Sequence, residues 1–424
     1  MSHPRKRASD PVKWCALLAV CFVLLCAIRI MIPSEPYFDE VHYVPAARAL
    51  LEQRQWLNQE HPMMGKELMA LSIAVLGDNA IGWRMLSLLA GGGALYAFMR
   101  AVWFGTRTRF APLASGILLA SGFQLFVHSR IAMLDIFMVA FFALAMWQCA
   151  AAVRQPETGR LRLAIAGVAL GLSMASKWNV VPLVPLPGVT FLIWRASTTG
   201  WRFATSQRGA PVPGITLAEA FLWLGIVPLL VYTLSYSPAL FLPDSPLEQI
   251  GLPEQHRIMI QLQESVTQTH PYQSGWQQWA LNTRAIWYLY EFTDGAQRGI
   301  VLIGNPLTML AGLPAMLWCA YAGLWKGRRD ALSIFILYSV SFGFWIIAAK
   351  PVQFYYHYFL PSCFLLIGLA LALDAIWRMG NRWFPLALLT LSMIVFALFY
   401  PILSAAPLAG PTSFEHWMLL NGWR

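Results

Sequence analysis

Charged residues are scarce in this sequence. Asp, Glu, Lys and Arg make up only 12% of its 424 residues, whereas they make up about a quarter of soluble domains. Hydrophobic residues reach 58%, and several apolar runs of about 18–22 residues are long enough to cross a hydrocarbon core of ~30 Å. Because a bilayer offers the backbone no hydrogen-bonding partners, such spans are helical. The composition therefore excludes a soluble protein and predicts an all-α polytopic membrane protein.

Sequence motifs for nucleotides and metals are also missing. There is no Walker A motif and no GxGxxG after a strand, so the sequence gives no support for a nucleotide-sugar donor. The six cysteines lie within or beside apolar runs without CxxC spacing, a pattern typical of small core residues. We therefore predict no disulfide framework, no metal and no cofactor. The net charge of +10 does not predict nucleic-acid binding, because the basic residues gather in loops between apolar runs.

Eleven apolar segments predict the membrane-spanning helices. The first follows a basic stretch and lacks a small-x-small cleavage site, so we interpret it as an uncleaved span and not a signal peptide. The predicted spans are 13–33, 80–102, 110–128, 131–153, 161–177, 179–195, 215–237, 300–325, 331–349, 357–377 and 384–405. They form one integral-membrane domain over residues 1–424.

The distribution of Lys and Arg predicts the orientation of this domain. With the N-terminus in the cytoplasm, every inner segment is basic, as the positive-inside rule requires. This topology predicts a plasma (inner) membrane protein whose C-terminus faces the outer, periplasmic side. It also gives two long outer loops, 33–79 and 237–299, whose partly amphipathic stretches are typical of helices lying on the membrane surface.

Polar residues from many segments meet at the outer side in this topology. Ionisable groups at a membrane boundary are costly and mark functional cavities, so their convergence predicts one outer-facing site. All histidines except His3 lie in outer segments, but without metal-ligand spacing. The candidate site residues are Asp39, Glu40, His42, His61, Lys66, Arg130, Asp135, Lys177, His270, Tyr272, Trp276, Lys350, Tyr356 and His357.

Each candidate also has a simpler interpretation. Asp39 and Glu40 are either a solvated acidic pair or a general base with a partner that orients it. Arg130 is either a snorkelling anchor or a phosphate clamp, since its planar fork donates two parallel hydrogen bonds. Lys66, Lys177 and Lys350 are either interface anchors or the remainder of a cationic pocket. Aromatic runs such as 354–356 form either an interfacial belt or a platform for a sugar.

Seven short motifs, in order along the chain, resemble the protein O-mannosyltransferase family. Met63 stands where that family has a second proline, and loop 237–299 is too short for the soluble domain of the eukaryotic members. The chain thus looks like a short bacterial member. The motifs are Asp39-Glu40, His61-Pro62-x-x-Gly65-Lys66, Ser129-Arg130-x-x-x-Leu134-Asp135, Ser176-Lys177-Trp178, His270-Pro271-Tyr272-x-Ser274-x-Trp276, Gly304-Asn305-Pro306 and Tyr356-His357-Tyr358-x-Leu360-Pro361.

The resemblance implies a GT-C glycosyltransferase fold and metal-independent, inverting transfer of a sugar from a polyprenyl-phosphate donor to a hydroxyl. It implies that Asp39 is the base, and we expect Glu40 and His61 to orient the base or the sugar. Arg130, with Lys177 or Lys350, is expected to bind the donor phosphate. The second-loop motif is expected to close the acceptor side.

Three alternatives to a protein acceptor remain open at this point. A transferase of the same fold would move a sugar such as aminoarabinose to lipid A or another lipid. A transporter of lipid-linked sugars would place polar groups near the bilayer midplane and show repeated halves, and neither feature is present. A non-catalytic scaffold would leave the pairing of Asp39 with Arg130 unexplained. Family members often pair, so a dimer is possible under the resemblance.

Overall fold

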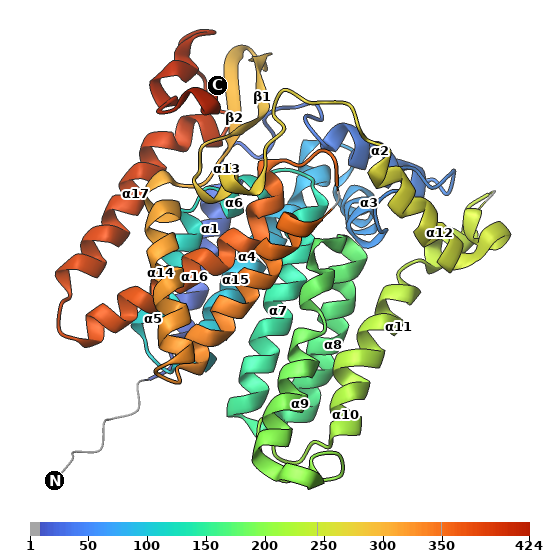
Figure 1. Cartoon of the computed structure of the whole chain (residues 1–424). Helices are drawn as coiled ribbons and strands as arrows, with labels where there is room; N and C mark the ends of the chain where they lie inside the picture. Colours follow the sequence, from blue (N-terminus) through green and yellow to red (C-terminus); the bar gives the residue numbers. More distant parts are fainter. Residues whose placement is uncertain (1–8, 244, 349) are drawn as a thin grey trace.

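The computed structural model describes residues 9–243, 245–348 and 350–424, and these residues are mostly helical. Figure 1 shows the helices side by side, with β1, β2, α2 and α12 near one end and the connection between α9 and α10 at the other. The basic segment Arg5–Arg7 and the last residue of the predicted span 331–349 lie outside the described residues. The helices are α1 (Val12–Ala27), α2 (Glu40–Leu51), α3 (Met64–Leu76), α4 (Ala80–Thr106), α5 (Phe110–Ala120), α6 (Gln124–His128), α7 (Leu134–Arg154), α8 (Gly159–Ser176), α9 (Leu186–Thr199), α10 (Leu217–Phe221), α11 (Val227–Leu234), α12 (Pro246–Glu264), α13 (Trp276–Ala280), α14 (Pro306–Leu324), α15 (Arg329–Ile347), α16 (Phe359–Arg378) and α17 (Trp383–Leu403).

Each of the eleven predicted spans overlaps one or more of these helices. Eight helical segments in the described part of the chain are long and apolar enough to cross a membrane by themselves, and α1 and α5 are shorter apolar helices. The helical fold is therefore confirmed, while the count of eleven spans stays a prediction. The eight segments are Ala80–Thr106, Leu134–Arg154, Trp178–Arg202, Leu217–Phe241, Pro306–Leu324, Arg329–Ile347, Tyr355–Arg378 and Trp383–Leu403.

The centre of the bundle is formed by α4, α7, α8 and α16. α7 packs against both α4 and α8, and α16 packs against α5, α14 and α15. Small residues let neighbouring backbones come close together. A Cβ atom added to Gly171 of α8 would lie 2.6 Å from the carbonyl oxygen of Pro228 in α11. The close approach at Gly171 brings α8 against α11, and Asp135 at the start of α7 and Lys177 after α8 are buried.

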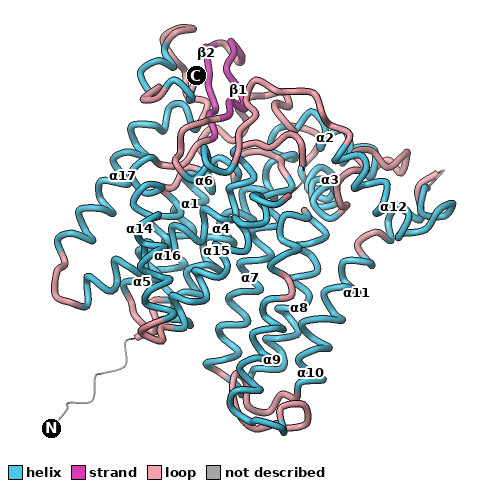
Figure 2. Tube along the Cα trace, viewed as in Figure 1, coloured by secondary structure: helices cyan, strands magenta, loops and turns pink. Residues whose placement is uncertain are grey.

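The two long outer loops are folded. The first carries α2 and α3, and the second carries α12, which is kinked at Gly251, the short α13 and an antiparallel hairpin of β1 (Ile286–Thr293) and β2 (Ala296–Leu302). Figure 2 shows this hairpin as the strand element above the helices. The predicted span 300–325 begins later than expected, because the chain stays extended to Leu302 and the helix begins at Pro306.

The hairpin has a local cause in the sequence. Its two-residue loop is Asp294-Gly295, and both residues have positive φ, 48° and 75°. Asp-Gly favours this tight connection because its twist matches that of the flanking strands. The C-terminal segment packs on the hairpin, where the amide of Leu408 donates to the carbonyl of Gln297 at 2.8 Å. Figure 1 places the C-terminus beside the same hairpin.

Candidate active site

The site begins at the turn between α1 and α2. Asp39 precedes the first residue of α2, and its neighbour Glu40 is fully buried. Both carboxylate oxygens of Glu40 accept from the guanidinium of Arg84 at 2.8 Å, and they also accept from the backbone amides of Tyr37 and Ala132. Because all of these contacts are inside the protein, the position of Glu40 is fixed on every side.

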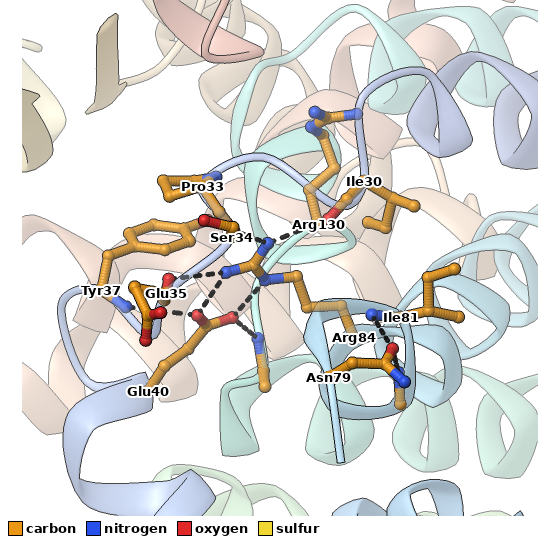
Figure 3. A network of polar contacts seen from close by, with 12 residues as sticks. Ile30, Pro33, Ser34, Glu35, Tyr37, Glu40, Asn79, Ile81, Arg84 and Arg130 are labelled. Carbon is orange, nitrogen blue, oxygen red and sulfur yellow. Dashed lines mark hydrogen bonds and ion pairs between the residues drawn. The ribbon is translucent and has the colours of Figure 1, made fainter. Parts of the chain in front are cut away.

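Arg84, at the start of α4, organises the loop that leads to Asp39. It donates to the carbonyl oxygens of Ile30 and Pro33 at 2.9 and 2.7 Å, and to that of Glu35 at 3.3 Å. Figure 3 shows its guanidinium between Glu40 and this loop. The sequence analysis missed Arg84, although an Arg four residues inside an apolar span is the kind of signal that marks an internal partner.

Asp39 lies among charges from several segments. It is half-buried, and its carboxylate makes no hydrogen bond or ion pair to any residue that the structure describes. Burial raises the pKa of Asp39 to about 6; the positive charge of Lys177 opposes this shift and the negative charge of Asp135 adds to it. The charges of His42 and Lys350 also act on it. Asp39 is thus free of structural partners and titrates near neutral pH.

Lys177 and Asp135 form a buried ion pair next to Asp39. Lys177 follows the last residue of α8, and its Nζ lies 2.6 Å from Asp135 Oδ2 at the start of α7. The other oxygen of Asp135 is buried without a partner among the described residues. The ammonium also lies 5.0 Å from the centre of the Tyr356 ring, a distance at which a cation is attracted to an aromatic face.

Lys350 adds a second positive charge to the same region. Burial, together with the charge of Lys177, lowers the pKa of Lys350 to about 8, and the negative charges of Asp135 and Asp39 oppose this shift. Asp39, Asp135, Lys177 and Lys350 come from four separate segments and act on one another electrostatically. The structure therefore brings together four of the predicted residues.

The first-loop motif residues His61 and Lys66 have different surroundings. Burial and the charges of Lys177, Lys66 and Lys350 hold the pKa of His61 well below its usual value, so the ring is neutral. His61 meets the ring of Tyr43 edge-on at 5.9 Å. The fully buried Lys66 donates to the carbonyl oxygens of residues 57, 58 and 61, and burial lowers its pKa to about 7. Lys66 therefore shapes the loop that presents His61.

Arg130 is the predicted residue that the structure keeps out of this cluster. Its guanidinium donates to the backbone carbonyls of residues 26, 28, 29 and 404. Its charge is not among those that act most strongly on Asp39. In this arrangement Arg130 joins the ends of α1 and α17. The hydrogen bonds of Arg130 and Glu40 therefore indicate structural roles.

The second-loop motif lies against the segment that carries Lys350 and Tyr356. The ring of His270 meets that of Phe354 at 5.1 Å and that of Tyr272 at 5.8 Å. Trp276 meets Phe342 edge-on at 6.0 Å. His357 is buried, with Trp345 at 4.0 Å and Tyr356 at 4.5 Å. These predicted residues form the wall beside Lys350, while His42 is exposed on α2.

Gly304-Asn305-Pro306 is a structural junction. The side chain of Asn305 donates to the carbonyls of Ser121 and Ser392 and accepts from the amide of Leu307, which caps α14. Among the residues described, no group of three His, Cys, Asp or Glu side chains could hold a metal ion.

The chain is similar in sequence to several known proteins. Residues 60–223 match a family model described as dolichyl-phosphate-mannose-protein mannosyltransferase. The polyprenol-phosphate-mannose–protein mannosyltransferase of Mycolicibacterium smegmatis is 26% identical over 466 residues, covering 92% of this chain and 88% of the relative. A Pseudomonas aeruginosa undecaprenyl phosphate-alpha-4-amino-4-deoxy-L-arabinose arabinosyl transferase is 28% identical over 199 residues, covering 43% and 35%.

Solved structures show the same fold. The Saccharomyces cerevisiae protein O-mannosyltransferase Pmt1-Pmt2 complex bound to the sugar donor matches with a TM-score of 0.83 at 13% identity, covering 99% of this chain and 93% of that chain. ArnT from Cupriavidus metallidurans bound to undecaprenyl phosphate matches with a TM-score of 0.58 at 15% identity, covering 86% and 61%. The predicted GT-C glycosyltransferase fold is therefore confirmed.

Proposed function

We propose that the chain, which is similar to protein O-mannosyltransferases, transfers mannose from a polyprenyl phosphate to a Ser or Thr hydroxyl of a secreted or membrane protein. The observation that carries the proposal is a cluster of Asp39, whose carboxylate has no hydrogen bond or ion pair within the described residues, with the two cations Lys177 and Lys350. A carboxylate of raised pKa can accept a proton, and paired cations can receive a phosphate. Sugar transfer from a lipid phosphate requires both a group that accepts the proton of the acceptor hydroxyl and a group that binds the phosphate.

Asp39 is the general base in this proposal. Its carboxylate takes the proton of the acceptor hydroxyl while that oxygen attacks the anomeric carbon from the face opposite the phosphate. The bond between the anomeric carbon and the phosphate oxygen breaks, its electron pair leaves with the polyprenyl phosphate, and the configuration at the anomeric carbon inverts. Burial places the pKa of Asp39 at about 6, close enough to neutral pH for efficient proton transfer.

Lys177 and Lys350 stabilise the charge that develops on the leaving phosphate. Fixed cations in a site with little water stabilise such a charge more strongly than they would in bulk solvent. The ion pair with Asp135 holds Lys177 in place. A phosphate near Lys350 would favour its protonated form and so raise its pKa again. Because a monophosphate leaving group carries less charge than a diphosphate, these cations can act without a metal.

The remaining residues of the site shape it. We assign Glu40 to positioning through its ion pair with Arg84 and leave Arg130 out of the phosphate site. His61 and Tyr356 face the sugar region in this proposal, and the wall of His270, Tyr272 and Trp276 closes the acceptor side. We propose that the site and the C-terminus face outward from the plasma membrane, where a secreted acceptor would meet it.

A lipid acceptor is the second candidate. The observation that favours it is the partial similarity to an arabinosyl transferase whose donor is an undecaprenyl phosphate sugar. The base and the cations would act in the same way, and only the hydroxyl or headgroup that receives the sugar would differ.

The test is transfer of radiolabelled mannose from polyprenyl phosphate in liposomes that hold the purified protein, secreted proteins and membrane lipids. We expect label in protein, and a loss of about 10²–10⁴-fold or more in Asp39→Asn. Arg48→Gln is the matched control, because Arg48 is on α2 and forms an exposed pair with Asp78.

The other outcomes separate the parts of the proposal. Label in lipid would move the acceptor to the second candidate and keep the enzyme. Transfer from another polyprenyl-phosphate sugar, with none from mannose, would change the donor. Undiminished transfer by Asp39→Asn would contradict the assignment of the base.

A further inference from the structure

The residue before Asp39 has an unusual backbone. Phe38 adopts a φ of +50°, in the left-handed region that side chains with a Cβ rarely occupy. Such a conformation persists only where the surrounding structure holds it in place, and it occurs most often at functional sites. Because Phe38 is bonded directly to Asp39, whatever holds Phe38 also determines where the Asp39 carboxylate points.

The β1–β2 hairpin of the second outer loop holds this residue. The ring of Phe38 stacks on Tyr288 of β1, with the centroids 3.9 Å apart and the planes 19° apart. Four residues earlier, the amide and hydroxyl of Ser34 donate to the two carboxylate oxygens of Asp294, at 2.9 and 2.5 Å. The hairpin thus contacts the loop before Asp39 at two points, Ser34 and Phe38.

The hairpin is itself anchored to the helices and to the C-terminal segment. Tyr288 is 4% exposed, and its hydroxyl lies 3.4 Å from Nε2 of His128. The ring of His128 stacks on Phe359 of α16 at 4.1 Å. Arg298 of β2 donates to the carbonyl of Thr293 across the turn at 3.0 Å and to that of Ala405 at 2.7 Å. A firmly held hairpin can therefore impose a conformation on the loop.

Asp39 needs such external support because its own carboxylate makes no hydrogen bond or ion pair within the described residues. On its C-terminal side, Glu40 is fixed by Arg84, as Figure 3 shows. On its N-terminal side, Arg84 holds the carbonyls of Pro33 and Glu35, and the two hairpin contacts hold Ser34 and the ring of Phe38. Resting on the proposed function of Asp39 as base, we propose that Tyr288 and Asp294 are positioning residues that aim this carboxylate at the acceptor hydroxyl.

A defect in aiming the base differs from a defect in binding the donor. A misplacement of about 1 Å in a reacting group costs on the order of 10²-fold in rate. The donor phosphate, in contrast, is assigned to Lys177 and Lys350, which lie on other segments. Loss of the hairpin contact should therefore lower kcat and leave the KM for the donor nearly unchanged.

The experiment compares Tyr288→Leu with Tyr288→Phe in the mannose transfer assay on the full chain. Leu removes the aromatic face that stacks on Phe38, whereas Phe keeps it. We expect Tyr288→Leu to lower kcat at least tenfold, with a donor KM within about twofold of wild type, and Tyr288→Phe to retain most of the activity. Phe292→Leu is the matched control, because Phe292 is on the same strand and 73% exposed.

Further variants at Phe38, Asp294 and Ser34 keep the test independent of folding. Phe38→Gly removes the stacked ring but lets the backbone adopt positive φ without strain, so it should fold like wild type and still lose kcat. Asp294→Ala removes both bonds from Ser34, whereas Ser34→Ala removes only the bond from the hydroxyl. Asp294→Ala should therefore lower kcat more than Ser34→Ala, and the double variant should lose no more than Asp294→Ala.

The outcomes are distinguishable from a failure of the proposed function. If Asp39→Asn is inactive while Tyr288→Leu and Phe38→Gly keep the wild-type kcat, the positioning role is overturned and the base assignment stands. A rise in donor KM at constant kcat would also overturn it, because it would make Tyr288 part of the donor site. If Asp39→Asn remains active, the proposed function itself has failed.

Discussion

Asp39 and Glu40 are neighbours in the sequence but lie in opposite environments. The carboxylate of Glu40 is saturated by Arg84 and two backbone amides, while that of Asp39 has no such partner and has a pKa raised to about 6. Interior partners stabilise a charge, and burial without them destabilises it. The carboxylate of Glu40 therefore stabilises the structure, and the carboxylate of Asp39 is available to react.

The first prediction concerns the pH dependence of transfer. Asp39 must be deprotonated to act as base, so kcat/KM should rise with pH through about 6 and then level off. Lys350 must stay protonated, so the rate should fall again above about 8. Initial rates between pH 4.5 and 9.5 would show both limbs. In Lys350→Arg the alkaline limb should disappear because Arg stays charged; if the limb is unchanged there, Lys350 does not cause it.

The second prediction concerns stability, and its sign follows from the direction of the same shift. In the folded state, burial raises the pKa of Asp39 from its ordinary value of 3.8 to about 6. The contribution of Asp39 to stability is therefore fully present below pH 3.8 and is lost as the pH rises through about 6. Asp39→Asn should raise the thermal midpoint in detergent, and by more at pH 7.5 than at pH 4.5. A lower midpoint at pH 7.5 would show that the ionised carboxylate is stabilised in the fold.

The third prediction concerns Glu40 and Arg84. Removing one member of a buried pair leaves the other charge uncompensated, so Glu40→Gln should cost roughly 3–5 kcal/mol of stability. The matched pair Arg48–Asp78 joins the same regions of the chain but is exposed, and Asp78→Asn should cost about 0–1 kcal/mol. Denaturant titrations of both variants would compare the two costs. Equal losses would mean that the burial of Glu40 does not determine its importance.

For the acidic pair Asp39-Glu40, the sequence could predict the role of one residue but not the surroundings of the other. The motif order indicated Asp39 as a base, but a sequence cannot show that Arg84, 44 positions away from Glu40, neutralises one carboxylate of the pair. The same limit applies to Arg130. The guanidinium of an Arg near the membrane boundary predicts phosphate binding. In this structure, however, the guanidinium of Arg130 donates to backbone carbonyls at the ends of α1 and α17.

At the scale of elements, α12 is linked to Lys177 through a network of aromatic side chains. The carbonyl of Leu252 accepts from Nδ1 of His256 at 2.7 Å, so Nε2 of that ring accepts the hydroxyl proton of Tyr232 at 2.5 Å. The oxygen of Tyr232 in turn accepts from Nε1 of Trp178 at 2.9 Å, and Trp178 directly follows Lys177. Tyr232 thus joins α12 to the segment that carries the cation.

The fourth prediction follows from this network. Tyr232→Phe removes the shared hydroxyl and frees Trp178, so Lys177 should be held less firmly and the donor KM should rise, about tenfold for a loss of ~1.4 kcal/mol. The kcat should change less than the KM. Arg257→Gln, an exposed variant of α12, is the control. A fall in kcat at constant donor KM would contradict a role in holding the phosphate-binding lysine.

The elements themselves were predictable to different degrees. Long apolar runs determined the spanning helices because the bilayer requires closed backbone hydrogen bonds. The hairpin was missed because Ile300–Ile303 was interpreted as the start of a span, although Asp294-Gly295 between two runs rich in aromatic and apolar residues is a strong hairpin signal. The error was consequential, because Tyr288 and Asp294 contact the loop that carries the base.

At the scale of the whole molecule, the arrangement has two chemically different ends. Figure 1 shows the hairpin, α2, α12 and the C-terminal segment at one end, and the connection between α9 and α10 at the opposite end. The site residues gather at the first end, and the loop at the other end carries Arg202 and Arg208. Basic loops favour the cytoplasmic side, so this asymmetry predicts a site that opens outward.

The fifth prediction tests this orientation with single cysteines. Glu415→Cys lies in the exposed C-terminal segment, and Gln207→Cys lies in the exposed loop between α9 and α10. Most native cysteines are buried or half-buried, and Cys21 is within the apolar α1, so wild type should give little background with a membrane-impermeant maleimide. In intact spheroplasts we expect labelling of Glu415→Cys only, and labelling of Gln207→Cys after permeabilisation.

The reverse labelling pattern, with Gln207→Cys labelled in intact spheroplasts and Glu415→Cys only after permeabilisation, would change the side of the membrane on which the reaction takes place. It would place Asp39, Lys177 and Lys350 on the cytoplasmic side. Asp39 precedes α2, which lies at the end of the molecule that carries the C-terminus, and the charges of Lys177 and Lys350 act on Asp39. A secreted acceptor could then meet the base only before export, and the positive-inside assignment of every loop would be inverted. Labelling of both variants in intact cells would instead mean that the two ends lie on the same side. An odd number of crossings between residues 207 and 415, such as the five spans predicted there, does not allow that result.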